Sequence, residues 1–270
     1  MVFLRKTISF VTFPIAKQFG KFSNLYKSQD CYIFGDGASV KSMDLRHFSD
    51  KPAIAVGTFP CHKDISYTNL KFWILPEPMF FLPKFRKGQY KSRRALRAHQ
   101  KFFSPKTFVP SNVSKILNVT NFPKGWSRNT FYLFDRFPHN HKNASPFFSR
   151  RDLFTGSINA SISLAIYLGF KKVFLVGFDY THNPPTSGHW YEIGPGEFQE
   201  LENYNVEFFE AAQELIELVT VTSFPTRTSI PSLSYQEHTG APLVYKENHE
   251  LTSQEVLLQL DKTSEYRIFN

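Results

Sequence analysis

The sequence predicts an α/β fold with a Rossmann-like, mostly parallel sheet and a basic lid or insertion. The first observation is a set of short apolar runs typical of strands buried on both faces: CYIFG (31–35), AIAVG (53–57), KFWILP (71–76), KKVFLVGF (171–178) and LVTVTSF (218–224). The second is helical spacing of apolar residues within 197–218, between the last two runs: Phe198, Leu201, Phe208, Phe209, Ala212, Leu215 and Ile216. Because strands separated by helices need crossover connections, the strands should be parallel.

Length and composition support a large folded unit. The 270 residues are 41% hydrophobic and include 30 Phe, which excludes disorder for most of the chain. We divide the chain into an N-terminal basic and aromatic segment (1–27), a Rossmann-like domain (28–230) with a lid or insertion at about 78–150, and a C-terminal extension (231–270) packed on the domain. Cys31 and Cys61 have no zinc or disulfide spacing. No apolar run reaches the ~18 residues of a membrane span.

The charge is positive and concentrated in one segment. A net charge of +9 favours an anionic partner: nucleic acid, acidic lipid, or a phosphorylated or carboxylated small molecule. No acidic residue lies between Glu77 and Asp135, whereas KFRKGQYKSRRALRAHQK (84–101) contains eight Lys and Arg. This segment is a solvated helix, a surface for anionic lipid headgroups or an anionic acceptor, or a nucleic-acid site.

Ligands of such sheets bind at the carboxyl ends of the strands, so the loops after strands are the candidate sites. The first is FGDGASVKSMD (34–44), where Gly35 and Gly37 permit a tight turn, the amides that follow could cradle a phosphate, and Ser39 adds a hydroxyl. The third glycine of the dinucleotide fingerprint is missing, and a purely structural turn is the alternative. A methyltransferase needs an acidic residue at the end of the second strand, and AIAVGTFP has none.

The second candidate site begins at a helix. Thr155 or Ser157 can cap a helix that Gly169 ends, and its apolar positions are Ile158, Ile162, Ala165 and Ile166. The amides at Thr155, Gly156 and Ser157 could hold an anion, although ordinary capping explains these residues equally well. Gly177 and Asp179 follow the next strand, where the carboxylate could orient a ribose, order a loop or cap.

The third feature is TSGHWYE (186–192), a histidine between glycine and aromatic residues. Gly188, Trp190 and Tyr191 suggest that His189 lies at the edge of a pocket, where an imidazole can act as a general base. His182 and His62 are rivals on the same argument.

Together, the glycine-rich turn, the helix that opens with a hydroxyl residue and Gly, the LGFKKVFLVGFD pattern and the later histidine resemble bacterial sialyltransferases of glycosyltransferase family 42. They also resemble the related motility accessory factor proteins, over roughly residues 28–60 and 150–192. The resemblance implies a GT-A-like Rossmann domain with a lid and a CMP-activated nonulosonic acid as donor substrate, without a further cofactor. By resemblance, Asp36 replaces an Asn of the family turn, Thr155 and Gly156 match its Ser-Gly, and His189 stands at the catalytic base.

The departures concern donor recognition. Gly57 stands where the family has Asn, Glu77 where it has a further Asn, and Thr181 where it has a phosphate-facing Tyr, with Tyr180 one place earlier. The expected donor-binding residues are therefore Gly35, Asp36, Gly37, Ser39, Gly57, Thr155, Gly156, Ser157 and Asp179, and the expected catalytic residues are His189, Tyr180 and Tyr191.

The implied reaction is an inverting transfer to a saccharide or glycolipid hydroxyl, in lipopolysaccharide or capsule biosynthesis. His189 would deprotonate the acceptor, while Tyr180 and Tyr191 would stabilise the departing phosphate. No metal is demanded, and the chain has no Asp-x-Asp. We expect a cytoplasmic homo-oligomer that contacts the anionic inner leaflet through 84–101. A transferase of another activated sugar, a pterin diphosphokinase-like enzyme, and a non-enzymatic nucleic-acid or acidic-lipid binding protein stay open.

Overall fold

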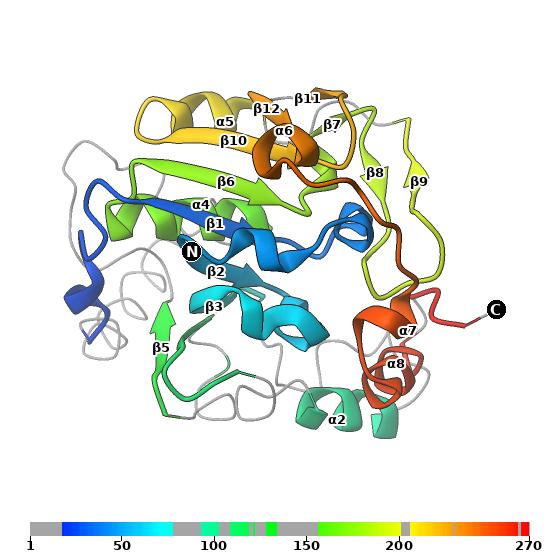
Figure 1. Ribbon diagram of the computed structural model, residues 1–270. Helices are drawn as coiled ribbons and strands as arrows, with labels where there is room; N and C mark the ends of the chain where they lie inside the picture. Colours follow the sequence, from blue (N-terminus) through cyan, green and yellow to red (C-terminus); the bar gives the residue numbers. More distant parts are fainter. Residues whose placement is uncertain are drawn as a thin grey trace.

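Eight parallel strands form the central sheet of the computed structural model (Figure 1), which describes residues 18–77, 93–102, 109–118, 121, 128–133, 156–200, 206–228, 230–263 and 266–269. The strand order is β12-β10-β6-β1-β2-β3-β4-β5. All neighbouring strands pair in parallel. The predicted α/β fold with a mostly parallel sheet is therefore confirmed.

The five predicted strands are all present: β1 (Asp30–Phe34), β2 (Pro52–Val56), β3 (Asn69–Leu75), β6 (Lys172–Val176) and β10 (Glu217–Thr222). Most of their residues are buried, as strands covered on both faces should be. Three further strands were not predicted from the sequence: β4 (Ser114–Asn118), β5 (Thr130–Leu133) and β12 (Ser232–Ser234). These three are short, mix polar with apolar residues and lie at or next to the edges of the sheet, so they lack a continuous apolar run.

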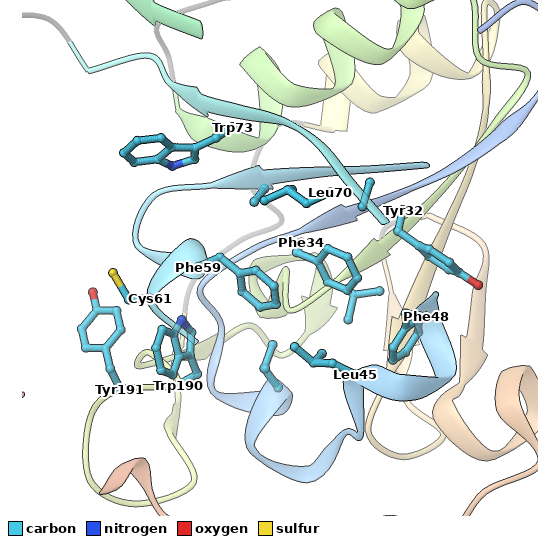
Figure 2. Close-up of a cluster of buried hydrophobic side chains, with 14 of the residues drawn as sticks. Tyr32, Phe34, Leu45, Phe48, Phe59, Cys61, Leu70, Trp73, Trp190 and Tyr191 are labelled. Carbon is cyan, nitrogen blue, oxygen red and sulfur yellow. The ribbon is translucent and has the colours of Figure 1, made fainter. Parts of the chain in front are cut away.

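Two hydrophobic clusters cover the two faces of the sheet. Alternate strand residues such as Ile33 and Leu175 pack with η1 (Gln18–Phe22), α4 (Ser157–Leu168) and α5 (Val206–Gln213). The intervening residues, such as Phe34 and Val176, pack with η2 (Ala38–Ser42), η3 (Leu45–Phe48), α6 (Tyr235–Thr239) and α8 (Gln254–Leu260). In Figure 2 the second cluster extends to Trp190 and Tyr191, next to Phe59.

The remaining elements are short. They are η4 (Phe59–Cys61), η5 (Lys63–Tyr67), η7 (Asp179–Thr181), α2 (Arg93–Phe102), α7 (Asn248–Leu251), and the paired strands β7 (His182–Asn183) with β11 (Arg227–Thr228) and β8 (Thr186–Ser187) with β9 (Glu197–Phe198). Among the described helices, none has the length and apolar character needed to cross a membrane. The described part of 231–270 supplies β12 to the sheet edge and α8 to the core, and both cysteines are buried thiols.

Helix α4 begins one residue away from the predicted caps. Gly156 is its N-cap and makes no side-chain capping bond, so Ser157 is the first helical residue rather than the cap. Thr155 lies outside the described residues. At the other end Gly169 adopts the left-handed conformation (φ 83°) and its amide bonds back to Ala165 and Ile166, so the predicted glycine stop is confirmed.

The predicted helix over 197–218 is too long. Helix α5 covers only Val206–Gln213, and Glu197–Phe198 belong to strand β9. Phe198 is 68% exposed and Leu215 is 43% exposed, whereas Phe209, Ala212 and Ile216 are buried. The amide of Ile216 bonds to the carbonyl of Ala212, which turns the chain into β10. The apolar spacing therefore joined helix α5 to Phe198 of β9 and to Leu215 and Ile216 in the turn before β10.

The order of the strands reverses between β1 and β6. From β1 the chain adds β2 to β5 on one side, and then returns to place β6, β10 and β12 on the other. At such a switch point the loops that follow the two central strands diverge and leave a crevice. Figure 1 shows the carboxyl end of β6 pointing towards the β8–β9 hairpin, which lies at the same edge of the sheet.

Candidate functional site

A cleft of about 900 Å³ opens at the switch point between β1 and β6. Its walls come from the loop after β1, the start of α4, the loop after β6 and the segment around β8. Residues expected from the sequence to be functional make up much of the lining: Asp36, Gly37, Gly156, Ser157, Asp179, Tyr180 and His189. Gly35, Ser39, Gly57 and Tyr191 are not part of this lining, and Thr155 lies outside the described residues.

The glycines of the first loop allow two loops to touch. A Cβ on either Gly35 or Gly37 would lie 2.6 Å from the carbonyl oxygen of Gly177, so only glycine fits at both positions. The Gly35 amide donates to Val176 and the Gly37 amide to Gly177, each at 2.8 Å. The Ser39 amide is also bonded within the protein, to Asp179. These three amides therefore hold the two loops together and are not available to a phosphate, and a phosphate site in this turn stays a prediction.

Asp179 orders the loop after β1. Its carboxylate accepts the Ser39 amide at 2.8 Å and the Ser39 hydroxyl at 2.5 Å. Asp179 is buried and still lines the cleft. Of the three roles considered for this carboxylate, the structure shows loop ordering. The bond also explains why the Ser39 hydroxyl is not presented to the cleft.

Asp36 connects three segments of the site. One carboxylate oxygen accepts the Thr58 amide at 2.9 Å, and the other accepts the indole N–H of Trp190 at 3.2 Å. Burial raises the pKa of this carboxyl, whereas His189 and the bonds from Thr58 and Trp190 act in the opposite direction. Gly57 makes room for this side chain, since a Cβ at position 57 would lie 2.0 Å from Asp36 Oδ2.

The start of α4 forms another part of the cleft wall. Gly156, Ser157 and Ile158 line the cleft there. The first amides of an α-helix have no partner within the helix and carry the positive end of its dipole, so they favour an anion. The Ser157 hydroxyl donates to Glu77 Oε1 at 3.2 Å, so an acidic group already lies beside this wall.

His189 lines the cleft from the segment that follows β8. Its ring stacks on Tyr191, with centroids 4.9 Å apart and an interplanar angle of 14°, and meets Tyr266 edge-on at 5.5 Å. Nδ1 lies 3.0 Å from Glu192 Oε1. The backbone of His189 also pairs with Gly37, which ties the histidine to the loop after β1. With Nδ1 on Glu192, Nε2 is the nitrogen available to a ligand.

The pKa of His189 is raised above its ordinary value. Burial alone would lower the pKa, but the hydrogen bond to Glu192 and the charges of Asp36, Glu192 and Asp179 outweigh that effect. An imidazole in this environment keeps its proton to a higher pH than an ordinary histidine does.

The two expected tyrosines have different positions. Tyr180 lines the cleft and is 50% exposed. Tyr191 is 1% exposed and lies under the His189 ring, where burial raises the pKa of its phenol. Thr181, which stands where the family has a phosphate-facing Tyr, is buried and donates its hydroxyl to the Phe178 carbonyl, so it does not line the cleft. Tyr191 therefore supports the histidine and does not face the cleft.

Neither rival histidine lines the cleft. His62 is buried between the rings of Phe59 and Trp190, and burial, with Lys246 and Lys63, lowers its pKa to about 3. His182 belongs to β7, and burial lowers its pKa as well. Both imidazoles are structural.

Glu192 was not predicted from the sequence, although it lies only three residues after His189. A carboxylate at i+3 from a loop histidine was the available signal. The bond from the Trp190 indole to Asp36 and the contact of Tyr266 with His189 were not predicted either. For Tyr266 no sequence signal existed, since it lies 77 positions along the chain.

Within the described ranges, no three His, Cys, Asp or Glu residues are arranged to hold a metal ion. No model of a known protein family matches the chain, and no curated protein matches it. Solved structures do resemble it. The sialyltransferase CstII from Campylobacter jejuni, solved with the substrate analogue cytidine 5'-monophosphate, is 14% identical, with a TM-score of 0.42 over 87% of this chain and 98% of that one.

Two further solved structures are similar to the same degree. The MAf glycosyltransferase from Magnetospirillum magneticum AMB-1 is 14% identical, with a TM-score of 0.43 over 89% of this chain and 38% of that one. The monofunctional α-2,3-sialyltransferase Cst-I from Campylobacter jejuni is 16% identical, with a TM-score of 0.35 over 82% and 86%. These proteins are of the kinds that the sequence motifs resemble. At these TM-scores the structural likeness assigns no activity to the chain.

Proposed function

We propose that the chain is a glycosyltransferase of sialyltransferase type, which transfers a nonulosonic acid from a CMP-activated donor to a saccharide hydroxyl. The observation that carries the proposal is the position of His189, held by Glu192, in a cleft at the switch point of a parallel sheet. The start of α4, which also lines the cleft, presents the first amides of a helix, and such amides favour an anion. The motifs of 28–60 and 150–192, which resemble the sialyltransferase family, supply the donor class.

The proposed step is one inverting displacement. The acceptor hydroxyl gives its proton to Nε2 of His189 while its oxygen forms a bond to the anomeric carbon of the donor. The bond from that carbon to the phosphate oxygen breaks, and CMP leaves with the electron pair. The imidazolium then returns its proton to water. No metal takes part in this scheme.

The leaving phosphate needs hydrogen-bond donors. The part of the cleft lining that the structure describes contains no Lys or Arg side chain. We therefore assign the phosphate to the first amides of α4 and to the hydroxyl of Tyr180, both on the cleft wall. Asp36, which keeps acceptor capacity beyond its bonds to Thr58 and Trp190, would receive a donor hydroxyl or amino group.

A thermal-shift screen tests the proposal. CMP at 100 times its Kd should stabilise the native protein by about 2.7 kcal/mol and raise Tm by roughly 5–10 °C, because it binds only the folded state. CDP, UDP, GDP, S-adenosylmethionine and a short RNA are measured in parallel at moderate salt. Hydrolysis or transfer of a CMP-nonulosonic acid by the same preparation then establishes the reaction.

The same screen decides between the alternatives. Stabilisation by UDP or GDP instead of CMP would mean that the donor carries another nucleotide, and the proposed transferase activity would stand. Stabilisation by RNA alone would contradict the enzyme and favour the nucleic-acid binding protein.

We also propose a peripheral contact with an anionic membrane through α2. Arg94, Arg97 and Lys101 are exposed and, at spacings of three and four residues, lie on one face of this helix. The rest of the basic segment, 84–92, lies outside the described residues. Each cation near an anionic bilayer contributes about 1 kcal/mol.

Changing these three residues to Gln should therefore weaken binding to phosphatidylserine vesicles by about 100-fold, measured by co-sedimentation. Changing the exposed Lys27, Arg46 and Lys171 to Gln removes the same charge elsewhere and is the matched control. Equal losses in both triple variants would contradict a localised contact. The predicted homo-oligomer also stays a proposal, which light scattering on these preparations tests.

A further inference from the structure

The C-terminal residues 266–269 return to the segment that carries His189. The Arg267 carbonyl accepts the Ile193 amide at 2.7 Å, and the Asn248 side chain donates to the carbonyls of both Tyr191 and Ile268, at 3.0 and 3.1 Å. Ile268 and Asn248 are both buried. These bonds hold residues 266–269 against the backbone of Tyr191 and Ile193, on either side of Glu192.

Glu192 lies between this tail and the imidazole. One carboxylate oxygen faces His189 Nδ1 at 3.0 Å, and the other lies 3.9 Å from Arg267 Nε. The Glu192 side chain is 7% exposed, whereas that of Arg267 is 45% exposed and also bonds to Glu197. Glu192 is therefore a carboxylate withdrawn from water whose two oxygens have separate partners.

We propose that Glu192 and Arg267 are positioning residues for His189, Glu192 selecting its tautomer and Arg267 holding Glu192 in place. This inference rests on the proposed function of His189 as the general base. Three side chains contact the ring: Tyr191 beneath it, Tyr266 at its edge and Glu192 at Nδ1. The remaining side lines the cleft.

The tautomer decides whether the histidine can act as a base. A carboxylate only accepts hydrogen bonds, so neutral His189 must carry its proton on Nδ1 to satisfy Glu192. Nε2 then presents a lone pair to the cleft. Without Glu192 the proton can occupy Nε2, where the ring would donate to the acceptor hydroxyl and could not receive its proton.

Ring ¹⁵N NMR of uniformly labelled protein tests the assignment without any activity. In the wild type, neutral His189 should show the Nδ1–H pattern of nitrogen shifts, assigned among the nine histidines by comparison with His189→Gln. In Glu192→Gln the Nε2–H form should become a major species, because the Gln amide can donate to Nδ1. The midpoint of the His189 titration should also fall, since the charge of Glu192 is lost while Asp36, Asp179, Tyr191, Tyr266 and Arg267 remain around the ring.

Kinetics provide the second readout. Glu192→Gln should lower kcat by about 100-fold or more, with the donor KM changed less than about threefold. The acidic limb of its plot of activity against pH should move to lower pH. Arg267→Met should lower kcat by about tenfold, and Arg267→Lys should recover part of that loss. Arg46→Met is the matched control, because Arg46 forms an exposed ion pair with Asp44 outside the cleft.

A wild-type protein whose neutral His189 carries its proton on Nε2 overturns the proposal, even if Glu192→Gln does not fold. So does an unchanged tautomer and titration in a folded Glu192→Gln. Absence of transfer from every CMP-linked donor would defeat the proposed function instead, and the NMR result would still stand on its own.

Discussion

Replacing His189 by Ala should lower kcat for transfer by about 10²–10⁴-fold while donor binding stays within about threefold. The imidazole is the titratable group of the cleft with a nitrogen open to the acceptor, and its partner Glu192 holds only Nδ1. The CMP moiety is assigned to the α4 wall and Tyr180, so its affinity should not depend on the ring. Transfer rates and the CMP-induced thermal shift, measured on one preparation, separate the two effects.

The pH profile of the wild type gives the same residue a second signature. The base works when it is neutral, and the pKa of His189 is raised, so activity should fall as pH drops through a value above the ordinary 6.5 of histidine. Plots of kcat/KM against pH locate this acidic limb. In His189→Ala the residual rate should lose the limb altogether.

The control for His189→Ala is His249→Ala, which removes an exposed histidine that does not line the cleft. It should retain full activity. If His189→Ala kept more than about a tenth of the wild-type kcat, another group would have to receive the proton and the proposed mechanism would fail.

How far the sequence predicts this molecule depends on how local each feature is. The central strands were predictable because a strand buried on both faces needs a continuous run of apolar residues, as in KVFLV of β6. The edge strand β5 and its neighbour β4 carry shorter, mixed runs and were missed. Helix α4 was predictable because Gly169 supplies a local stop, whereas nothing local separated α5 from the apolar residues beside it.

The site divides in the same way. The positions of Asp36, Asp179 and His189 could be predicted, because strand ends meet at one edge of a parallel sheet. Their bonds could not. Whether the amide of Gly37 meets a phosphate or the carbonyl of Gly177 depends on the distance between two loops 140 positions apart. The support of His189 by Tyr266 likewise comes from the far end of the chain.

The second large effect is expected at Gly57. A methyl group there would lie 2.0 Å from Asp36 Oδ2, and φ at this residue is +52°. The left-handed backbone alone costs about 1–2 kcal/mol for a non-glycine residue. Asp36 can move only by giving up its bonds to Thr58 and Trp190, and a hydrogen bond to a charged group contributes about 1.5–3 kcal/mol.

Gly57→Ala should therefore lower the free energy of unfolding by about 4–8 kcal/mol if both bonds are lost, a large part of the stability of a typical domain. Gly240→Ala is the matched control, because Gly240 has φ +73° with nothing within 4 Å of an added Cβ, and it should lose only about 1–2 kcal/mol. Urea unfolding curves of the two variants give the difference that the clash alone contributes.

Because the clash at position 57 is with the Asp36 carboxylate, the stability lost in Gly57→Ala should depend on that carboxylate. Removing its carboxylate in an Asp36→Ala background leaves room for a methyl group at 57, so Gly57→Ala should then cost no more than Gly240→Ala. A double-mutant cycle measures this coupling directly. Equal losses at 57 in both backgrounds would mean that the carboxylate is not seated against Gly57, and the link between the loops after β1 and β2 would have to be abandoned. A coupling of several kcal/mol would instead show that glycine at 57 and aspartate at 36 form one unit, so that a side chain at 57 and the carboxylate at 36 exclude each other in this cleft.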